Sequence, residues 1–328
     1  MNSPFLRIML VLVLGIPTLA GGQPAKRTSF AFATIEQGGK LLTEHDDFVS
    51  RLSPFDRAAR MKTNQDVSEQ DYLSFVARNV LDWDSDGQVL VQSALSDLQP
   101  RLDGLGLPFP ETVYFVKTTG AEEGGAGYTR GAAIVLPRPM LDEKNRKFLR
   151  EIIAHELFHV LSRRNPQLKE QLYAAIGFQP CGEIVFPAAL VEAKITNPDA
   201  PKNDHCISLK IGNESVWAAP ILYSPAARYD TNRGGEFFQY LRMQFLVVER
   251  NGGGTDAKAI YDPTHPRLVS PDQVSGFYEQ VGRNTDYIIH PEEILADNFK
   301  LFLLQQTNVP SPQILQKLGE ALAGYKSH

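Results

Sequence analysis

The chain is poor in cysteine: it has 2, Cys181 and Cys206, among 328 residues. So few cysteines exclude a disulfide-rich scaffold. Neither cysteine belongs to a C-x-x-C pair, which makes both of them poor candidates for metal ligands. We predict one disulfide between them, as an oxidising compartment would allow, and two buried free thiols are the alternative.

The chain also lacks an excess of positive charge and, beyond its first residues, any long apolar run. Its 33 Lys and Arg residues against 38 Asp and Glu residues give a formal net charge of −5. An acidic chain is a poor match for nucleic acid or for an anionic membrane surface, so neither is expected as a partner. A membrane-spanning helix needs about 20 apolar residues. No later segment provides them, so we expect no membrane span.

Residues 1–22 have the pattern of a secretory signal peptide. Arg7 precedes an apolar run over 8–16, and Ala20 ends a small-residue cleavage site. The run is too short to hold the chain in a bilayer. The sequence therefore predicts a signal peptide over residues 1–20 and a mature protein that is secreted or periplasmic.

The strongest functional signal is an H-E-x-x-H motif formed by His155, Glu156 and His159. It lies in a segment, 142–165, that we expect to form one helix. Two histidines four positions apart share one helical face, so both imidazoles can reach a single metal ion. Glu156 points partly round the same face, where it can hold a metal-bound water and act as a general base. This arrangement is typical of zinc peptidases.

The residues around the motif are almost all apolar, which indicates a buried helix. Burying two imidazoles and a carboxylate without partners costs several kcal/mol, and a bound cation would offset that cost. The alternative is purely structural. In it, the two histidines are hydrogen-bonded to the backbone of the core and the glutamate pairs with an arginine.

A third metal ligand is needed, because a catalytic zinc site usually combines three protein ligands with one water. No further histidine follows His159 closely, and the best candidate lies at 290–299. Pro291 and the acidic pair after it suit the start of a helix. Glu293 and Asp297 share one face of that helix, so one carboxylate can bind the metal while the other orients a ligand histidine.

Two other interpretations of this acidic segment stay open. Glu292 is the rival ligand, but position 296, four residues later, is alanine rather than an acid. The segment also suits a plain helix start, with favourable charges near the N-terminus and a solvated face.

The combination of H-E-x-x-H with E-x-x-x-D on a later helix resembles the gluzincin metallopeptidases. The alanine before Asp297 is also similar to the E-x-x-A-D pattern of HtpX-type peptidases, although the membrane helices of that type are missing here. The resemblance implies that His155, His159 and Glu293 bind Zn²⁺, that Glu156 is the general base, and that Asp297 orients a ligand histidine. It covers two short helices, and the segment between them is much longer than in thermolysin.

The fold that the resemblance implies is α+β and zincin-like, a mixed sheet with an edge strand next to the H-E-x-x-H helix and a second helical segment that supplies a metal ligand. By the same resemblance, the strand before the motif helix pairs with an extended substrate. The other predicted elements follow from local patterns. They are a mostly helical region over 41–104, strands over 112–117, 128–136, 185–194 and 206–211, and helices over 236–249 and 311–322.

Residues 82–87 match the start of a calcium loop, D-x-D-x-D-G. The twelfth position of such a loop, however, is Ser93 here and not a bidentate glutamate. The alternative is an aspartate-rich turn that caps the next helix.

Together these features predict an exported zinc-dependent peptidase that acts on a peptide or protein substrate. The oxyanion is expected to be stabilised by Tyr287 or His290, with Tyr261 and His265 as weaker candidates. Residues 21–328 are expected to form a single metallopeptidase-like catalytic domain, with two lobes dividing near 166 as a variant. The alternatives are a catalytically inactive zinc protein that binds peptides or partners, and a zinc hydrolase of non-peptide amides.

Overall fold

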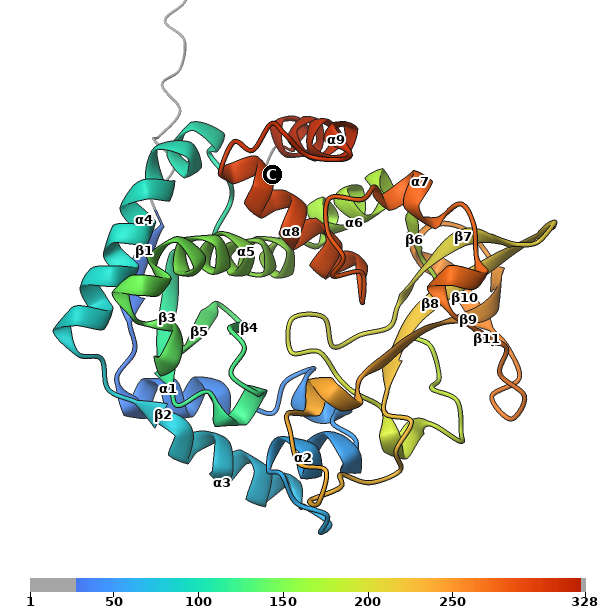
Figure 1. The fold of residues 1–328 in the computed structure, drawn as a ribbon. Helices are drawn as coiled ribbons and strands as arrows, with labels where there is room; N and C mark the ends of the chain where they lie inside the picture. Colours follow the sequence, from blue (N-terminus) through green and yellow to red (C-terminus); the bar gives the residue numbers. More distant parts are fainter. Residues whose placement is uncertain (1–27, 326–328) are drawn as a thin grey trace, which may run out of the picture.

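The structure is a computed structural model that describes residues 28–325, apart from the side chain of Thr255. The predicted signal peptide lies outside the described residues. Among the helices of the described part, none has both the length and the apolar character needed to cross a membrane. The predicted α+β class is confirmed: two sheets flank a long helix that carries the H-E-x-x-H motif (Figure 1).

The first sheet is mixed, and its main strands run in the order β1-β3-β5-β4. β1 and β5 are parallel to β3, whereas β4 is antiparallel to β5 and β2 is antiparallel to β3. The strands are β1 (Ser29–Phe32), β2 (Val80–Leu81), β3 (Thr112–Thr118), β4 (Tyr128–Arg130) and β5 (Ala133–Pro137).

The single strand predicted over 128–136 is wrong in one respect, because a turn splits it into β4 and β5. Gly131 stands in this turn with φ 58°, a left-handed conformation that glycine adopts without strain. The reversal places β4 at the end of the sheet, next to the motif helix. An edge strand beside this helix is therefore present, and it is short.

Helices cover both faces of the first sheet, as the alternation of side chains along β3 shows. Phe115 belongs to the large core shared with α4 (Ser85–Leu105) and α5 (Arg146–Arg164). Its neighbour Val116 points the other way, into a second cluster with residues of α1 and α3. The helices of the predicted helical region are α1 (Ile35–Leu42), α2 (Pro54–Arg60), α3 (Glu69–Asn79) and α4.

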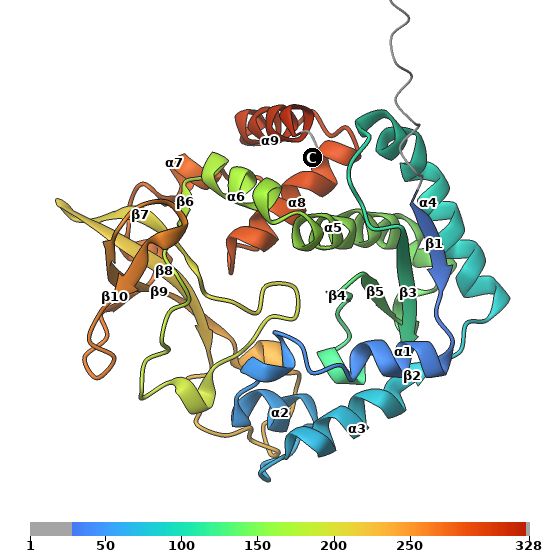
Figure 2. The ribbon, with the colours of Figure 1, turned by 180° about the vertical axis from the view of Figure 1, so that it is seen from behind.

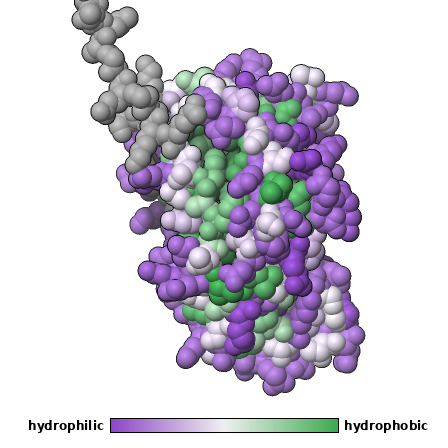
Figure 3. Space-filling model, turned by 90° about the vertical axis from the view of Figure 1, so that its left-hand side faces the viewer, coloured by the Kyte–Doolittle hydropathy of each residue, from purple (hydrophilic) through white to green (hydrophobic). Residues whose placement is uncertain are grey.

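The aspartate-rich turn at the start of α4 is a helix cap. The Asp84 carboxylate accepts a hydrogen bond from the Gly87 amide at 2.8 Å and forms an ion pair with Lys117. A capping aspartate satisfies an amide that has no partner inside the helix. The side of the molecule on which α4 lies mixes apolar and hydrophilic surface (Figure 3), and Val89 of α4 is exposed.

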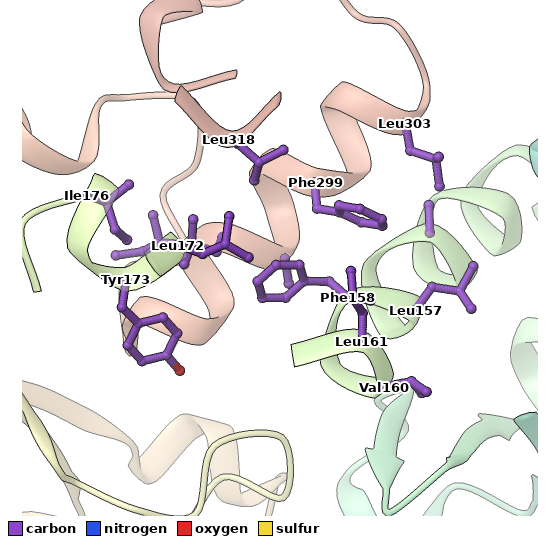
Figure 4. Packing of buried hydrophobic residues seen from close by; sticks show 14 of the residues in the cluster. Leu157, Phe158, Val160, Leu161, Leu172, Tyr173, Ile176, Phe299, Leu303 and Leu318 are labelled. Carbon is purple, nitrogen blue, oxygen red and sulfur yellow. The ribbon is translucent and has the colours of Figure 1, made fainter. Parts of the chain in front are cut away.

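Helices α4, α6 (Pro166–Ala175) and α8 (Pro291–Leu303) contact the motif helix and hold it in place. α5 crosses α8, and Phe158 meets Phe299 there with ring centroids 5.6 Å apart (Figure 4). Leucines of α6 and α9 (Pro312–Gly324) extend the same cluster. Each fully buried Leu or Phe contributes about 1.5–3 kcal/mol. The predicted motif helix and C-terminal helix are thus confirmed.

The second sheet is antiparallel and lies across the molecule from the first, with α6 and α8 between the two (Figures 1 and 2). Its strands run in the order β10-β9-β8-β7-β6, and β11 also pairs with β9. A short helix, α7 (Phe277–Val281), lies beside β7. The strands are β6 (Phe178–Pro180), β7 (His205–Ile211), β8 (Glu214–Tyr223), β9 (Arg242–Asn251), β10 (Lys258–Ile260) and β11 (Leu268–Val269).

Two predictions in this region are wrong. The helix expected over 236–249 is a short 3-10 turn followed by β9, because the valines at 247 and 248 fit a strand, and residues 242–248 pair with β8. The strand expected over 185–194 is irregular, because Pro187 cannot donate to a ladder. The strand predicted over 206–211 is confirmed as β7.

Cys181 and Cys206 carry free, buried thiols rather than the predicted disulfide. Cys206 lies on β7, and Cys181 directly follows β6, the strand that pairs with it. A hydrogen bond with Cys206 and burial raise the pKa of the Cys181 thiol, so Cys181 is held as a protonated thiol in the core.

Candidate metal centre

The motif residues face α8 from the middle of α5, in the interior of the protein. His155, Glu156 and His159 are 8%, 2% and 0% exposed, and Glu293 of α8 is 1% exposed. The long apolar contact between the two helices places these four polar side chains opposite one another.

Three of these side chains can hold one metal ion. His155 Nε2 lies 3.0 Å from Glu293 Oε2, and His159 Nε2 lies 3.6 Å from the same oxygen. One ligand atom from each residue falls within 4.8 Å of the other two. Two nitrogens and one carboxylate oxygen form a donor set that suits a divalent metal such as zinc with an open fourth position.

One orphaned atom tests whether a metal fits this position. His159 Nε2 is buried and is among the few polar side-chain atoms of the described chain that have no hydrogen-bond partner. Its ring is fully buried, so water does not solvate it. Leaving such a group unsatisfied costs about 1–3 kcal/mol. A cation between His155, His159 and Glu293 would remove that cost.

The outer nitrogen of each histidine is held by a carboxylate of α8. His155 Nδ1 lies 3.0 Å from Asp297 Oδ1, and His159 Nδ1 lies 3.2 Å from Glu292 Oε1. When Nδ1 carries the proton and donates it to the carboxylate, Nε2 is left free for the metal. Glu292 therefore contacts the outer nitrogen of His159, while Glu293 lies near the Nε2 atoms of both histidines.

These two carboxylates are themselves fixed by neighbours. The Tyr173 hydroxyl donates to Glu292 at 2.6 Å, and the Ser162 hydroxyl donates to the same carboxylate. Lys300 donates to Asp297 at 2.6 Å. Residues in this outer layer commonly change metal affinity about 10–100-fold when they are replaced.

The sequence analysis missed three residues that complete the site. The Thr129 hydroxyl donates to Glu156 Oε2 at 2.7 Å, and the Thr129 amide donates to Asp199 at 2.6 Å. Asn197 donates to Glu293 Oε1 at 2.6 Å. Asn197 and Asp199 stand in an irregular segment without periodicity, so no local pattern marks them.

The electrostatics of the site favour a positive charge at its centre. Burial by itself lowers the pKa of His155, because it disfavours the charged ring. Hydrogen bonds to Asp297 and Glu293 act in the opposite direction and prevail, so the pKa of His155 lies well above its usual value. Burial and the nearby Asp199 raise the pKa of Glu156 to about 7. Burial and Glu293 also raise the pKa of Asp199. A proton or a metal cation would satisfy this excess of carboxylates.

The candidate oxyanion residues lie in different places. Tyr287 is 40% exposed and lines a pocket together with Asn197 and Asp199, next to the metal ligands. Burial and the charges of Glu293 and Asp199 raise the pKa of its phenol well above the usual value. Both ring nitrogens of His290 are engaged: Nδ1 accepts from the Glu292 amide at 3.1 Å as the cap of α8, and Nε2 donates to the Lys202 carbonyl at 3.2 Å.

The two weaker candidates belong to other surroundings. Tyr261 donates to the Val185 carbonyl beside the second sheet, and His265 pairs with Asp262 in an exposed turn. The structure does not bring either of them to the metal ligands.

An apolar pocket opens beside the metal ligands. Ile195, Leu222, Phe237 and Phe238 supply its apolar walls, while Asp199 and Tyr287 lie on its polar side. Such walls suit an apolar group of a ligand.

Comparisons with protein-family models, with curated proteins and with solved structures gave no match. The assignment of this site therefore depends on its own geometry.

A buried ion-pair cluster supports the site from the side of α6. His205 Nδ1 lies 2.6 Å from Asp204, and Nε2 lies 3.1 Å from Glu170. Burial by itself lowers the pKa of His205, but hydrogen bonds to these two carboxylates act in the opposite direction and raise the pKa to about 9. The ring also lies 4.6 Å from that of Tyr173, the residue that holds Glu292.

The stability of the protein should depend on the charge of His205. Its folded pKa exceeds the unfolded value of about 6.5, so the stabilisation is complete below that pH and is lost as the pH rises towards 9. We expect the loss to be about 2 kcal/mol, because Glu170 is partly solvated. Urea unfolding of the wild type and of His205→Gln should show a large difference near pH 6 and a small one above pH 9. If the free energies of unfolding of the two proteins differ by the same amount at every pH, the charge of His205 does not stabilise the fold.

Proposed function

We propose that the protein is an exported, zinc-dependent peptidase of the gluzincin type with a zincin-like catalytic domain. The observation that carries the proposal is the buried set of His155, His159 and Glu293, in which His159 Nε2 has no hydrogen-bond partner among the described residues. Glu156 and Asp297 complete the pattern around it. The signal-like N-terminus supports export.

Each residue of the site has a role in this proposal. When bound, zinc supplies a Lewis acid that polarises the scissile carbonyl and acidifies a water molecule. Glu156 accepts the proton of that water and delivers it to the leaving amine. The Thr129 hydroxyl, 2.7 Å from Glu156 Oε2, keeps this carboxylate in one orientation. Asp297 and Glu292 orient the two histidines.

Tyr287 is the proposed oxyanion donor. It lines the pocket beside the metal ligands, and its phenol, which is protonated at neutral pH as in any tyrosine, can donate a hydrogen bond to a developing negative charge. His290 is left out of this role because both of its ring nitrogens already have backbone partners.

Two features near the metal ligands suit a peptide substrate. β4 is a sheet edge, and an extended peptide can add to such an edge through main-chain hydrogen bonds. The apolar pocket beside it suits an apolar group of the substrate. The alternatives are a zinc protein that binds peptides without cleaving them and a zinc hydrolase of non-peptide amides.

The metal content of the purified protein tests the proposal. We expect about one zinc per chain in the wild type, as a single mononuclear site requires, and little or none in Glu293→Ala. The matched control is Glu151→Gln, on the same helix as the motif but paired only with Lys147 at 4.0 Å; it should keep its zinc. If Glu293→Ala keeps zinc and Glu292→Gln loses it, the ligand is Glu292. A wild type without metal would rule out the peptidase.

Export has a separate test. Expression of the full chain in a bacterial host with a secretory pathway, followed by N-terminal sequencing of the exported product, should give a first residue shortly after Ala20. A product that stays in the cytoplasm with its N-terminus intact would contradict export without affecting the metal site.

A further inference from the structure

A three-residue segment divides the space beside the metal ligands. Residues 197–199, called the partition here, belong to an irregular stretch that reaches β4 from the side of the second sheet (Figure 1). Pro198 and Asp199 line the apolar pocket, and the same two residues line a larger polar hollow. The partition is therefore the wall between these two hollows.

Both helices of the site hold the partition in place. Asn197 donates to Glu293 of α8 at 2.6 Å and accepts from the Asp199 amide at 3.0 Å. Arg163 of α5 donates to the carbonyls of Pro198 and Asp199 at 3.2 Å each. Because these bonds come from opposite sides, the wall is fixed relative to the metal ligands.

The partition meets the edge strand β4 at Thr129. The Thr129 amide donates to Asp199 Oδ1 at 2.6 Å and not to the neighbouring strand β5, so it is an outward group of the sheet edge. Residues 126–128 line the apolar pocket on one side of this contact, and residues 130–131 line the polar hollow on the other. An extended peptide that followed the edge of β4 would be stopped at Thr129.

The part of the edge that stays free lies at Gly127. Alternate residues of an antiparallel strand turn their main-chain groups outward, so the outward residue before Thr129 is Gly127. A Cβ atom at this position would lie 3.7 Å from Glu156 Oε1, which places the main chain of Gly127 close to the proposed general base. A peptide that pairs here has its cleaved bond near Glu156 and one of its ends at the partition.

Asp199 presents a carboxylate to that end. It is partly exposed, and one of its oxygens lies within 4.8 Å of ligand atoms of Glu156 and His159. Arg163 donates to main-chain carbonyls of the partition, and no cationic side chain among the described residues forms an ion pair with Asp199. A carboxylate attracts an ammonium group and repels another carboxylate. The chain end that fits is therefore the N-terminus.

We propose that the enzyme is an aminopeptidase, in which Asp199 binds the α-ammonium group of the substrate and the partition limits cleavage to the first peptide bond. The inference rests on the proposed function, because it needs the metal bound by His155, His159 and Glu293, and it names the substrate class of that site. The C–N bond after the first residue breaks, the oxygen of water bonds to the carbonyl carbon, and Glu156 passes the proton of that water to the leaving amine.

Covalent geometry agrees with this role. In any amino acid, two bonds of about 1.5 Å place the amine nitrogen about 2.5 Å from the carbonyl carbon. The group that binds the amine must therefore lie within a few ångströms of the group that activates the water. Thr129 fixes the two relative to each other, because its hydroxyl donates to Glu156 at 2.7 Å and its amide donates to Asp199. That amide occupies one Asp199 oxygen and leaves the other for the ammonium group.

The first test uses the wild type and does not depend on a variant that folds. A short peptide with leucine at its free N-terminus, and the same peptide with that amine acetylated, are incubated with the zinc-loaded protein and followed by mass spectrometry. We expect residues to leave the free peptide one at a time from its N-terminus, while the acetylated peptide stays intact.

Other cleavage patterns would overturn the inference. If both peptides are cut at the same internal bond, or if residues leave from the C-terminus, the inference fails while the proposed function stands. If the zinc-loaded protein cleaves neither peptide nor a casein-like protein, the proposed function fails as well.

A variant tests the role of the carboxylate. Asp199→Asn keeps the size of the side chain and can still accept from the Thr129 amide. We expect its kcat/KM for the free peptide to fall about 10–100-fold, as the loss of a hydrogen bond to a charged group predicts, and its zinc content to stay unchanged. The control Asp66→Asn removes a carboxylate that is 86% exposed, and it should keep wild-type activity.

A desamino peptide, which lacks only the N-terminal amine, separates substrate binding from a structural effect. The wild type should prefer the peptide that carries the amine, and Asp199→Asn should lose most of that preference. If Asp199→Asn retains both the wild-type kcat/KM and the wild-type preference, Asp199 does not bind the ammonium group and the inference is overturned.

Discussion

Replacement of Glu156 by glutamine is expected to lower kcat/KM for peptide hydrolysis by about 10²–10⁴-fold. Glutamine has nearly the same shape and can still accept the hydrogen bond that Thr129 donates to this position at 2.7 Å. It cannot take the proton of the attacking water. Because Glu156 lies beside the His155, His159 and Glu293 set and not within it, the zinc content should stay near one per chain.

The measurement is the release of fluorescent fragments from a labelled casein-like protein by the metal-loaded enzyme. Glu151→Gln, on the same helix, is the control and should retain the activity of its parent. Full processing by Glu156→Gln would contradict the role of this residue as the general base.

The choice of substrate separates the proposed peptidase from its alternatives. A peptidase should cleave the protein substrate, and the cleavage should depend on Glu156. A hydrolase of non-peptide amides should instead turn over small amides and leave the protein intact. A zinc protein that binds without turnover should leave both unchanged while it retains its metal.

Replacement of Arg60 by methionine is expected to destabilise the protein by about 3–5 kcal/mol. The Arg60 side chain is 0% exposed and lies 2.6 Å from both Asp56 and Glu123. Methionine fills much of the volume but leaves two buried carboxylates without their cation. Burial already raises the pKa of Glu123, and the loss of Arg60 would raise it further.

Urea unfolding at neutral pH measures this effect. Arg228→Met is the control, because that side chain is 68% exposed and contacts exposed Asp66 and the Asn64 carbonyl at the surface; its effect should lie within about 0.5 kcal/mol. A loss below about 1 kcal/mol for Arg60→Met would mean that water reaches the cluster. Arg60 also donates to the Thr196 carbonyl at 2.9 Å, so the variant should loosen the backbone next to Asn197, the residue that donates to Glu293.

The two helices of the site could be predicted because their signals are local. His155 and His159, and likewise Glu293 and Asp297, follow the helical period, so spacing alone puts each pair on one face. The pairing of α5 with α8 was taken from a resemblance, and the apolar packing of Phe158 against Phe299 provides its physical basis.

The errors fall where local patterns are ambiguous. The apolar run before residue 250 fits either a helix or a strand, and only the hydrogen bonds from β8 make it a strand. Likewise, the sequence 128–136 reads as one continuous strand, and the left-handed Gly131 that divides it becomes visible only in the structure. The two cysteines show the same limit: an even count allows a disulfide, and the structure holds them as free thiols.

The sequence by itself determined the α+β class, the two helices that carry the site and the residue types that can bind a metal. Only the tertiary structure decided which acid of α8 faces both histidines and which orients one of them. It also decided that the Thr129 amide, on the edge strand β4, donates to Asp199. The reason is physical: Thr129 and Asp199 are 70 residues apart in the chain, no period relates them, and the packing of the two sheets around α5 brings their atoms within hydrogen-bond distance.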